Sequence, residues 1–396
     1  MTICVIGAGP AGLFAAIAAA DRGAEVYILE KNSLPGRKLL ITGSGQCNLT
    51  HQGSPVQLLS HMGPAGTFLK PAFYSWTSDD TRAFFADRGV ATYAEEQGKV
   101  FPKSRKASDV LEALVNQCRT SKVRIICGAA VSRIEEGFCI TCRDHSRYRA
   151  ERVILASGGA SYPATGSAGD GYSLARSLGH EIVEPKPALC AVEVSDHILS
   201  NLSGLSFRKA RMSLYRNNKK ILSHQDDLLI TPRGYSGPAI LNRSRYMEAG
   251  DVLEFDFTSD GRLSSSLSGG ITVQTLVQRS GIPRRMAETL LEAAGIPGKG
   301  KAAETSKEKL RRIEQMACSF RCTISSPGTF PSAMVSAGGV SRREINRKTM
   351  ESTLVPGLFF AGEVIDIDGE TGGYNLQAAW STGMAAGIHS AQLSLR

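Results

Sequence analysis

The sequence predicts an α/β fold with a Rossmann-like nucleotide-binding domain, and three observations near the N-terminus support this prediction. An apolar run at Ile3–Ile6 has strand character and leads into Gly7-Ala8-Gly9-Pro10-Ala11-Gly12. An alanine-rich segment with the pattern of a buried helix follows, to about Asp21. A second apolar run, Val26–Leu29, ends in Glu30. Strand, glycine turn, helix, strand and acid in this order form a dinucleotide-binding fingerprint.

Each part of this fingerprint has a physical role. Gly7 permits the tight turn, Gly9 lets the backbone approach a pyrophosphate, and Gly12 allows close packing of helix and strand. The free N–H groups at the helix start face the phosphates. Glu30 follows eighteen residues after Gly12 and can accept hydrogen bonds from a ribose diol. We therefore expect a bound dinucleotide; the alternative is a glycine-rich turn in an unrelated α/β domain.

The composition predicts a soluble, cytoplasmic protein of two or three domains. The chain has 396 residues, of which 42% are hydrophobic, which is enough to bury a large core. The first strand begins directly after Met1-Thr2, which leaves no room for a signal peptide. No stretch approaches the roughly eighteen apolar residues of a membrane span, so no membrane association is expected.

Nine scattered cysteines predict reduced thiols rather than a disulfide framework. Cys139 and Cys142 resemble a metal or redox pair, but the segment 138–142 reads as a strand that places them on opposite faces. Cys318 and Cys322 have the i, i+4 spacing of a helix. Buried thiols explain these cysteines better than a zinc site, so no metal is predicted.

Two later segments suit a two-part flavin site. Residues 153–159 form an apolar strand that runs into Gly158, and residues 357–363 form another that ends in Ala361-Gly362-Glu363. A glycine-rich segment from Gly369 to Asn375 then leads into a helix expected from Leu376 to about Leu393. The acid can hold ribityl hydroxyls, and the helix start can stabilise negative charge on a reduced flavin.

These motifs give the chain a near full-length resemblance to the BaiN-like NAD(P)/FAD-dependent oxidoreductases, a bacterial flavoprotein family. The matching stretches, in chain order, are Gly36–Thr50, Val100–Pro102, Gly158–Pro163, Gly166–Tyr172, Gly234–Pro238, Ala337–Val340, Ala361–Glu363 and Gly372–Gln377. The resemblance implies FAD as cofactor and a FAD-binding domain formed by both chain ends. It also implies an inserted β-barrel-like domain with a small helical insert.

The order of the motifs predicts the same domain organisation. Residues 1–185 and 336–396 would form the FAD-binding domain, and residues 186–335 the inserted domain. Within the insertion, alternating patterns predict β structure at about 186–265 and 320–335. Helix-forming residues, as in Ala287–Ala294, predict helices at about 266–319.

The residues predicted to bind FAD come from all parts of the FAD-binding domain. They are Gly7, Gly9, Pro10, Ala11, Gly12, Glu30, Lys31, Arg37, Lys38, Gly45, Cys47, Asn48, Ala130, Val131, Ser157, Gly158, Gly362, Glu363, Gly373, Asn375, Leu376 and Gln377.

Two positions depart from the family pattern. Gln46 stands before the Cys-Asn pair where the family usually has Arg. Thr231 is followed by Pro232 and Arg233, where the family usually has His in a Thr-His-x-Gly segment. If those residues act on substrate in the family, this member differs in substrate.

The sequence also limits which reactions a bound flavin would carry out in this protein. There is no second strand–glycine turn–helix unit, so NAD(P)H would dock transiently as an electron donor. Cys47 lacks a nearby partner, which disfavours a thiol–disulfide relay. Tyr162, Tyr235 and Tyr374 lie beside glycine-rich turns, where a hydroxyl could donate a proton during reduction of a C=C bond. Tyr374 and Tyr162 are the preferred candidates.

The loop after Cys47 supplies further polar candidates. Asn48, with His51 behind it, could donate to flavin or substrate; a structural Asn and a surface His are the alternative.

The net charge of +9 is concentrated in the insertion. Residues 186–335 hold 21 Lys and Arg against 14 Asp and Glu, a net charge of +7. One basic cluster comprises Arg208, Lys209, Arg211, Arg216, Lys219 and Lys220, and the other Lys299, Lys301, Lys307, Lys309, Arg311 and Arg312. Such clusters form either a solvated surface or a binding surface for RNA or an acidic substrate.

Three enzymatic functions follow from these observations. The first is NAD(P)H-dependent reduction of an activated C=C bond in a small molecule. The second is the same reduction of uracil to dihydrouracil in ribosomal RNA. The third is flavin-dependent oxidation of a small amine or amino ketone. A non-enzymatic flavin-bound sensor is the remaining alternative.

Overall fold

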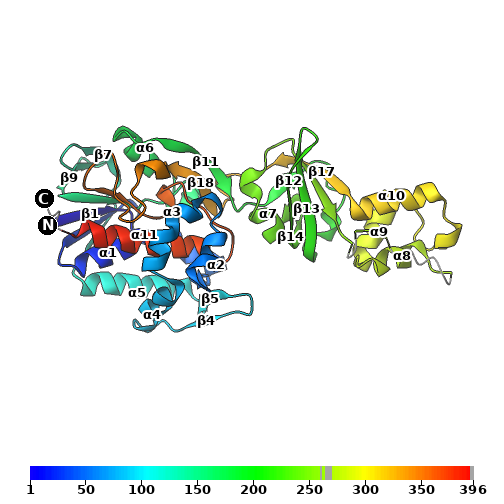
Figure 1. The fold of residues 1–396 in the computed structure, drawn as a ribbon, viewed down its shortest axis with the longest axis horizontal. Helices are drawn as coiled ribbons and strands as arrows, with labels where there is room; N and C mark the ends of the chain where they lie inside the picture. The colour runs from blue at the N-terminus through cyan, green and yellow to red at the C-terminus, as the bar shows by residue number, and fades with distance from the viewer. Residues whose placement is uncertain (259–260, 264–269, 393–396) are drawn as a thin grey trace. The chain divides into compact units, whose positions relative to one another are not determined.

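The structure is a computed structural model that describes residues 1–258, 261–263 and 270–392. The chain divides into two compact units (Figure 1). Unit 1 comprises Met1–Lys186 and Met334–Arg396, and unit 2 comprises Pro187–Ala333. The sequence predicted the FAD-binding domain at residues 1–185 and 336–396, which is within two residues of these bounds.

The core of unit 1 is a parallel five-stranded sheet with the strand order β19-β10-β1-β2-β6. The strands are β1 (Thr2–Ile6), β2 (Glu25–Glu30), β6 (Arg124–Cys127), β10 (Arg152–Leu155) and β19 (Leu358–Phe360). β1 and β10 are apolar along almost their whole length, because strands of a parallel sheet are covered on both faces. The predicted α/β fold is therefore confirmed.

Two helices from opposite ends of the chain pack tightly together beside this sheet (Figure 1). They are α1 (Pro10–Ala20) and α11 (Tyr374–Ser390). A Cβ atom added to Gly383 of α11 would lie 2.5 Å from Ala11 O, and one added to Gly387 would lie 2.3 Å from Ala15 O. The two glycines thus allow the helix backbones to approach, and the C-terminal segment becomes part of the N-terminal core.

The remaining elements of unit 1 pack around this sheet and its two helices. The helices are α2 (Pro55–Ser60), α3 (Gly66–Ser75), α4 (Ser78–Ala86), α5 (Ala107–Thr120) and α6 (Asp170–Ser177). Two small antiparallel sheets are β3 (Thr50–His51), β5 (Lys99–Pro102) and β4 (Thr92–Ala94), and β7 (Val131–Glu135), β8 (Cys139–Cys142) and β9 (Arg147–Arg149). β11 (Ile182–Ala188) pairs with β18 (Val335–Val340).

Unit 2 is built on a closed six-stranded barrel, as the family resemblance implied. Its strands are β12 (Val192–Val194), β13 (Ser206–Arg216), β14 (Lys219–Thr231), β15 (Gly234–Ser236), β16 (Val252–Asp256) and β17 (Phe320–Ser326). The short helix α7 (Pro238–Leu241) follows β15. Phe255 and Tyr235 are fully buried and fill the barrel core together with aliphatic side chains.

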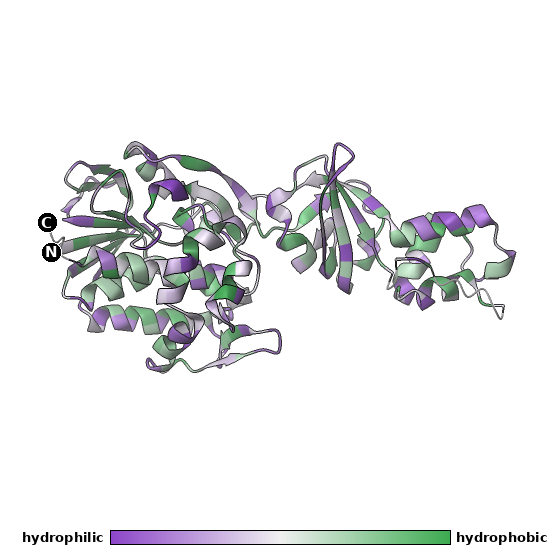
Figure 2. Ribbon diagram, in the orientation of Figure 1, coloured by the Kyte–Doolittle hydropathy of each residue, from purple (hydrophilic) through white to green (hydrophobic). Residues whose placement is uncertain are grey.

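In the described part of the segment between β16 and β17, three helices form the expected helical insert. They are α8 (Val273–Arg279), α9 (Arg284–Ala293) and α10 (Lys307–Cys318). Figure 2 shows hydrophilic stretches along α10, whose buried positions Ile313 and Ala317 lie one turn apart. The start of the predicted helical segment, residues 266–269, lies outside the described residues.

The structure settles the readings of the paired cysteines. β8 alternates as predicted, with Cys142 buried and Cys139 half-buried on the opposite face. The helical spacing of Cys318 and Cys322 was misleading: Cys318 ends α10, and Cys322 lies in β17. The helix ends between them, because Ser319 has a non-helical backbone conformation, so they do not share a helix face. Across the described residues, no helix combines the length and apolar character needed to cross a membrane.

Candidate functional site

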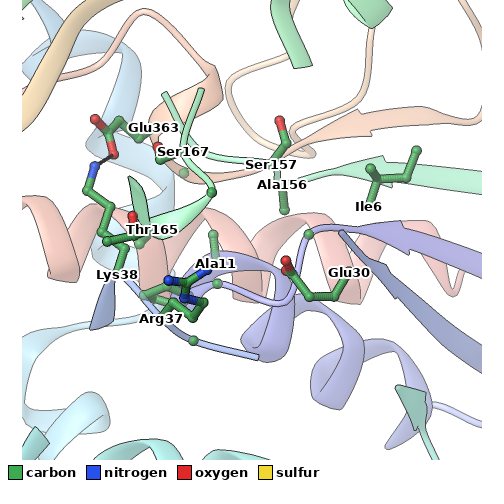
Figure 3. A pocket seen from close by; sticks show the side chains of 18 of the residues that line it. Ile6, Ala11, Glu30, Arg37, Lys38, Ala156, Ser157, Thr165, Ser167 and Glu363 are labelled. Atoms are coloured by element: carbon green, nitrogen blue, oxygen red, sulfur yellow. Dashed lines mark hydrogen bonds and ion pairs between the residues drawn. The ribbon is translucent and has the colours of Figure 1, made fainter. Parts of the chain in front are cut away.

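A cavity in unit 1 opens at the carboxyl ends of the parallel strands. Its lining includes Ile6 at the end of β1, Glu30 at the end of β2 and Ala156 directly after β10 (Figure 3). Gly362 and Glu363 line it after β19. In open α/β sheets, ligands bind at this edge, where loops and helix starts converge.

The three glycines of the fingerprint meet different surroundings, which define where a ligand can lie. Gly7 has a φ of +104°, and a Cβ there would lie 2.6 Å from Ala156 O. A Cβ on Gly12 would lie 1.9 Å from Gly7 O, so Gly12 serves packing alone. A Cβ on Gly9 would meet no protein atom within 4 Å. Gly9 therefore borders the open cavity, as expected where backbone approaches a pyrophosphate.

Two helix N-termini line the same cavity. α1 begins with Pro10 and Ala11 after Gly9, and α11 presents Asn375 and Leu376 in its first turn. Neither helix has a side-chain cap. The first N–H groups of a helix lack intrahelical acceptors and carry partial positive charge. The cavity thus offers two places that favour negative charge, one from each end of the chain.

Glu30 is held in place at the end of β2. One carboxylate oxygen accepts a hydrogen bond from Ala8 N at 2.8 Å. The other accepts from Asn32 N at 2.8 Å and from Asn32 Nδ2 at 2.7 Å. A carboxylate has about four lone-pair positions, so acceptor capacity remains for the hydroxyls of a ribose.

Glu363 is also fixed, by a different set of donors. Lys38 Nζ lies 2.7 Å from Glu363 Oε2, as Figure 3 shows. Ser161 Oγ donates to Oε1 at 2.8 Å, and Ser336 N donates to the same oxygen at 2.7 Å. Lys38 neutralises the acid in the cavity wall. The expected contact of Glu363 with ribityl or phosphate stays a prediction.

Most of the predicted FAD-binding residues line the cavity. They are Gly7, Gly9, Pro10, Ala11, Glu30, Lys31, Arg37, Lys38, Ala130, Val131, Ser157, Gly158, Gly362, Glu363, Asn375 and Leu376. The side chain of Asn375, however, is turned toward its own loop. Its Oδ1 accepts from Gly369 N at 2.8 Å and its Nδ2 donates to Gly369 O at 2.9 Å.

The other predicted contacts, Gly12, Gly45, Cys47, Asn48, Gly373 and Gln377, do not line the cavity. Gln377 is fully buried, where Thr50 donates to its Oε1 at 2.6 Å and its Nε2 donates to Trp76 O at 3.1 Å. Cys47 is also fully buried, and burial raises the pKa of its thiol to about 12. These two residues therefore belong to the protein interior behind the cavity and do not form its wall.

The tyrosines separate into three environments. Tyr235 is part of the barrel core and is fully buried, so it is excluded as a proton donor at this cavity. Tyr162 is half-buried in a left-handed turn with a φ of +52°. Tyr374 begins α11, directly before the lining residues Asn375 and Leu376. Neither Tyr162 nor Tyr374 lines the cavity.

The side chains of Tyr374 and Asn48 are both tightly packed near the start of α11. The Tyr374 ring contacts both His51 and His61, at centroid distances of 4.8 and 4.4 Å, and the two histidine rings are 6.4 Å apart. A Cβ on the adjacent Gly373 would lie 2.9 Å from Asn48 Oδ1, and this buried oxygen has no hydrogen-bond partner in the described part of the chain. An amide packed against the start of α11 is consistent with either a structural or a substrate-binding role.

Several residues that line the cavity were not predicted from the sequence. They include Asn32, Thr42, Arg143, Thr165, Ser167, Asp170 and Met334. Asp170 pairs with Lys31 and lies 3.5 Å from Arg143. Its place in the matching stretch Gly166–Tyr172 was a usable signal. Arg143 follows β8, and nothing in its local sequence relates it to the glycine turn.

Comparisons with known proteins agree with this geometry. The profile of the family described as "HI0933-like protein Rossmann domain" matches residues 1–389. A 3-dehydro-bile acid delta(4,6)-reductase of Clostridium scindens is 33% identical, covering 98% of this chain and 99% of the relative. A ribosomal RNA dihydrouridine synthase of Haemophilus influenzae is 30% identical, covering 97% of each chain.

A solved structure has the same fold. It is the 3-ketosteroid-delta4-(5alpha)-dehydrogenase of Rhodococcus jostii, with a TM-score of 0.53 and 17% identity, covering 99% of this chain and 96% of that one. At this identity the likeness shows the fold alone.

The fold and the site define a FAD-dependent oxidoreductase. The chain belongs to the HI0933-like family, since the family profile covers almost its whole length. The resemblance to BaiN-like oxidoreductases is thereby confirmed.

Proposed function

We propose that this protein is a NAD(P)H-dependent reductase of an activated C=C bond in a small molecule. The observation that carries the proposal is the near full-length similarity to the Clostridium scindens reductase. The Haemophilus influenzae relative forms dihydrouridine, which is also the product of reducing a C=C bond next to a carbonyl group. A shared reaction type across two different substrates supports this chemistry better than it supports any one substrate.

The residues present suit FAD. Gly9 and the start of α1 would hold the pyrophosphate, Glu30 the adenosine ribose, and the start of α11 the flavin end. When bound, FAD supplies hydride chemistry. The chain's own task is then to orient the substrate, exclude water and deliver a proton.

Tyr374 is our proposed proton donor. Burial, and secondarily the charge of Glu370, raises its pKa to about 12. The phenol therefore stays protonated at neutral pH and can act as an acid. Its hydroxyl has no hydrogen-bond partner among the described residues, and the residue lies directly before the lining residues Asn375 and Leu376. Asn48 and Tyr162 remain the other proposed contacts to the substrate.

An anaerobic experiment tests this function. Adding NADH or NADPH to the purified protein should bleach the flavin absorbance, and a subsequent enone should restore it. The restored absorbance should match the amount of saturated product, measured by mass spectrometry. If an amine bleaches the flavin while neither nicotinamide does, the protein is an oxidase of the alternative kind. Bleaching that only oxygen reverses would also contradict the proposal.

Reduction of uracil in ribosomal RNA is the second candidate, and the charge of unit 2 favours it. Lys307, Lys309, Arg311 and Arg312 on α10 have no ion-pair partner among the described residues. In the other basic cluster, Arg208–Lys220, two of the six cations are paired, since Arg216 lies 2.8 Å from Asp251 and Arg211 lies 3.4 Å from Asp256. Free cations on one helix suit phosphates.

Salt dependence tests this second candidate. If α10 binds RNA, affinity for a ribosomal RNA fragment should fall steeply with salt. A Lys307→Gln, Arg311→Gln double variant should reduce the slope of log K against log salt by about 2. Arg284→Gln, which removes a cation paired with Glu288 at 2.9 Å, is the matched control. Equal slopes for the wild type and the double variant would remove α10 as the RNA surface.

A further inference from the structure

A cluster of titratable side chains beside the cavity is not explained by FAD binding. It consists of His51 on β3, His61 at the end of α2, Glu370 in the glycine-rich loop and Tyr374 on α11. The three rings are nearly parallel, with interplanar angles of 18° between His51 and Tyr374 and 11° between His61 and Tyr374. Segments far apart in sequence thus meet around one tyrosine.

Each histidine is oriented by a bond at the same ring nitrogen. His61 Nδ1 lies 2.7 Å from Glu370 Oε2, and His51 Nδ1 lies 2.8 Å from Gln52 O. The backbone adds a second link, since Glu370 N donates to His61 O at 2.9 Å. These contacts fix the His61 ring against the Tyr374 ring.

The loop between Glu370 and Tyr374 is shaped to permit this stack. Gly372 and Gly373 have φ values of +130° and +98°, which side-chain-bearing residues rarely adopt. A Cβ on Gly372 would lie 2.9 Å from Tyr374 Cε2. Asn375 closes the loop through its bonds to Gly369 and Glu370. The position of Tyr374 is therefore over-determined, as expected for a group that must meet a substrate at a fixed angle.

We propose that His61, held by Glu370, is a positioning residue that keeps the Tyr374 hydroxyl at the substrate and, as an imidazolium, stabilises the tyrosinate formed there. This inference rests on the proposed function. In the step concerned, hydride adds to one carbon of the C=C bond and the Tyr374 proton to the other. The two electrons of the hydride come from NAD(P)H, and solvent returns the proton to Tyr374.

The charges around His61 determine the expected pH dependence. Glu370 and the rings of Tyr374 and His51 face it, with the His51 centroid 6.4 Å from that of His61, and Lys99 lies opposite His51 in the β3–β5 ladder. An imidazolium facing Tyr374 favours the tyrosinate, whereas a neutral imidazole does not. The pH profile of turnover should therefore change when the imidazole of His61 is removed.

The test compares kcat for enone reduction in four variants across that pH range. Tyr374→Phe should lower kcat by about 10²- to 10⁴-fold, the usual effect of losing a general acid. His61→Phe keeps a stacking ring but no charge, so it should lower kcat by about tenfold, less than loss of a direct oxyanion donor. Its pH profile should be flat. Glu370→Gln replaces the carboxylate that contacts His61 Nδ1, so its pH profile should also differ from that of the wild type. Tyr74→Phe, at an exposed tyrosine of α3, is the control.

Two readouts separate the outcomes. FAD content and the rate of flavin bleaching by NAD(P)H should stay at the wild-type level in all four variants, which shows that they fold. If His61→Phe fails to retain FAD, the pH profile of Glu370→Gln decides alone. A wild type inactive on every enone would refute the proposed function. Normal wild-type turnover with an unchanged pH profile in His61→Phe and Glu370→Gln would refute only the role of His61.

Discussion

A Gly9→Ala variant should be purified with little or no FAD, although its apoprotein should be as stable as that of the wild type. The added methyl meets no protein atom within 4 Å and the residue has φ −81° and ψ −176°, which alanine adopts without strain. The methyl extends instead into the space where a pyrophosphate would lie. Overpacking of this kind costs about 1–3 kcal/mol, which corresponds to about 5- to 150-fold weaker binding.

Two measurements check this expectation. FAD stoichiometry after purification, and the Kd from titrating apoprotein with FAD, should both show the loss. The Tm of the Gly9→Ala apoprotein should equal or slightly exceed that of the wild-type apoprotein, because replacing Gly at a compatible site removes freedom from the unfolded chain. Gly300→Ala in unit 2, where the nearest atom lies at 3.3 Å, is the matched control. Full FAD occupancy in Gly9→Ala would place the pyrophosphate elsewhere.

The sequence was informative wherever structure depends on neighbouring residues. The glycine turn between β1 and α1, the acid at the end of β2 and the strand β8 all follow from local patterns. Local alternation predicted β structure in unit 2, but its closure into a barrel followed from the family resemblance, because β12 and β17, which pair with each other, lie far apart in the sequence. Cys318 and Cys322 show the limit: their spacing fits a helix, but Ser319 already has φ −144° and the chain turns into β17.

Side-chain direction was the part of the site that sequence did not reveal. Leu376 and Gln377 are neighbours at the start of α11, yet Leu376 lines the cavity and Gln377 points into a buried network. Successive helix residues differ in direction by about 100°, so only the packing partner decides which one faces the ligand. The partners of Gln377 include Thr50 and Trp76, about 300 positions earlier in the chain. No local pattern encodes such a contact.

The packing of α1 on α11 leads to the second large expected effect. Helix propensity alone predicts that Gly387→Ala stabilises the protein by about 1 kcal/mol, since alanine is the better helix former. The structure predicts the opposite sign. The new Cβ would lie 2.3 Å from Ala15 O and 2.7 Å from Ala18 Cβ, and backbone oxygen in a packed helix cannot easily move away. Gly387→Ala should therefore lower the free energy of unfolding. Gly387→Leu, which adds a larger side chain at the same place, should lower it by at least about 3 kcal/mol.

Thermal unfolding of the wild-type and Gly387→Leu apoproteins measures this loss of stability. For a unit of this size, about 3 kcal/mol corresponds to a fall in Tm of about 6–12 °C. His389→Leu, two residues further along α11 and half-buried, should change the free energy of unfolding by no more than about 0.5 kcal/mol. Because α11 also presents its first turn to the cavity, Gly387→Leu should lose FAD although residue 387 lies more than three turns from Asn375. A Gly387→Leu protein with wild-type Tm would show that α1 and α11 do not pack backbone to backbone, and the C-terminal contribution to the cavity would have to be reassigned.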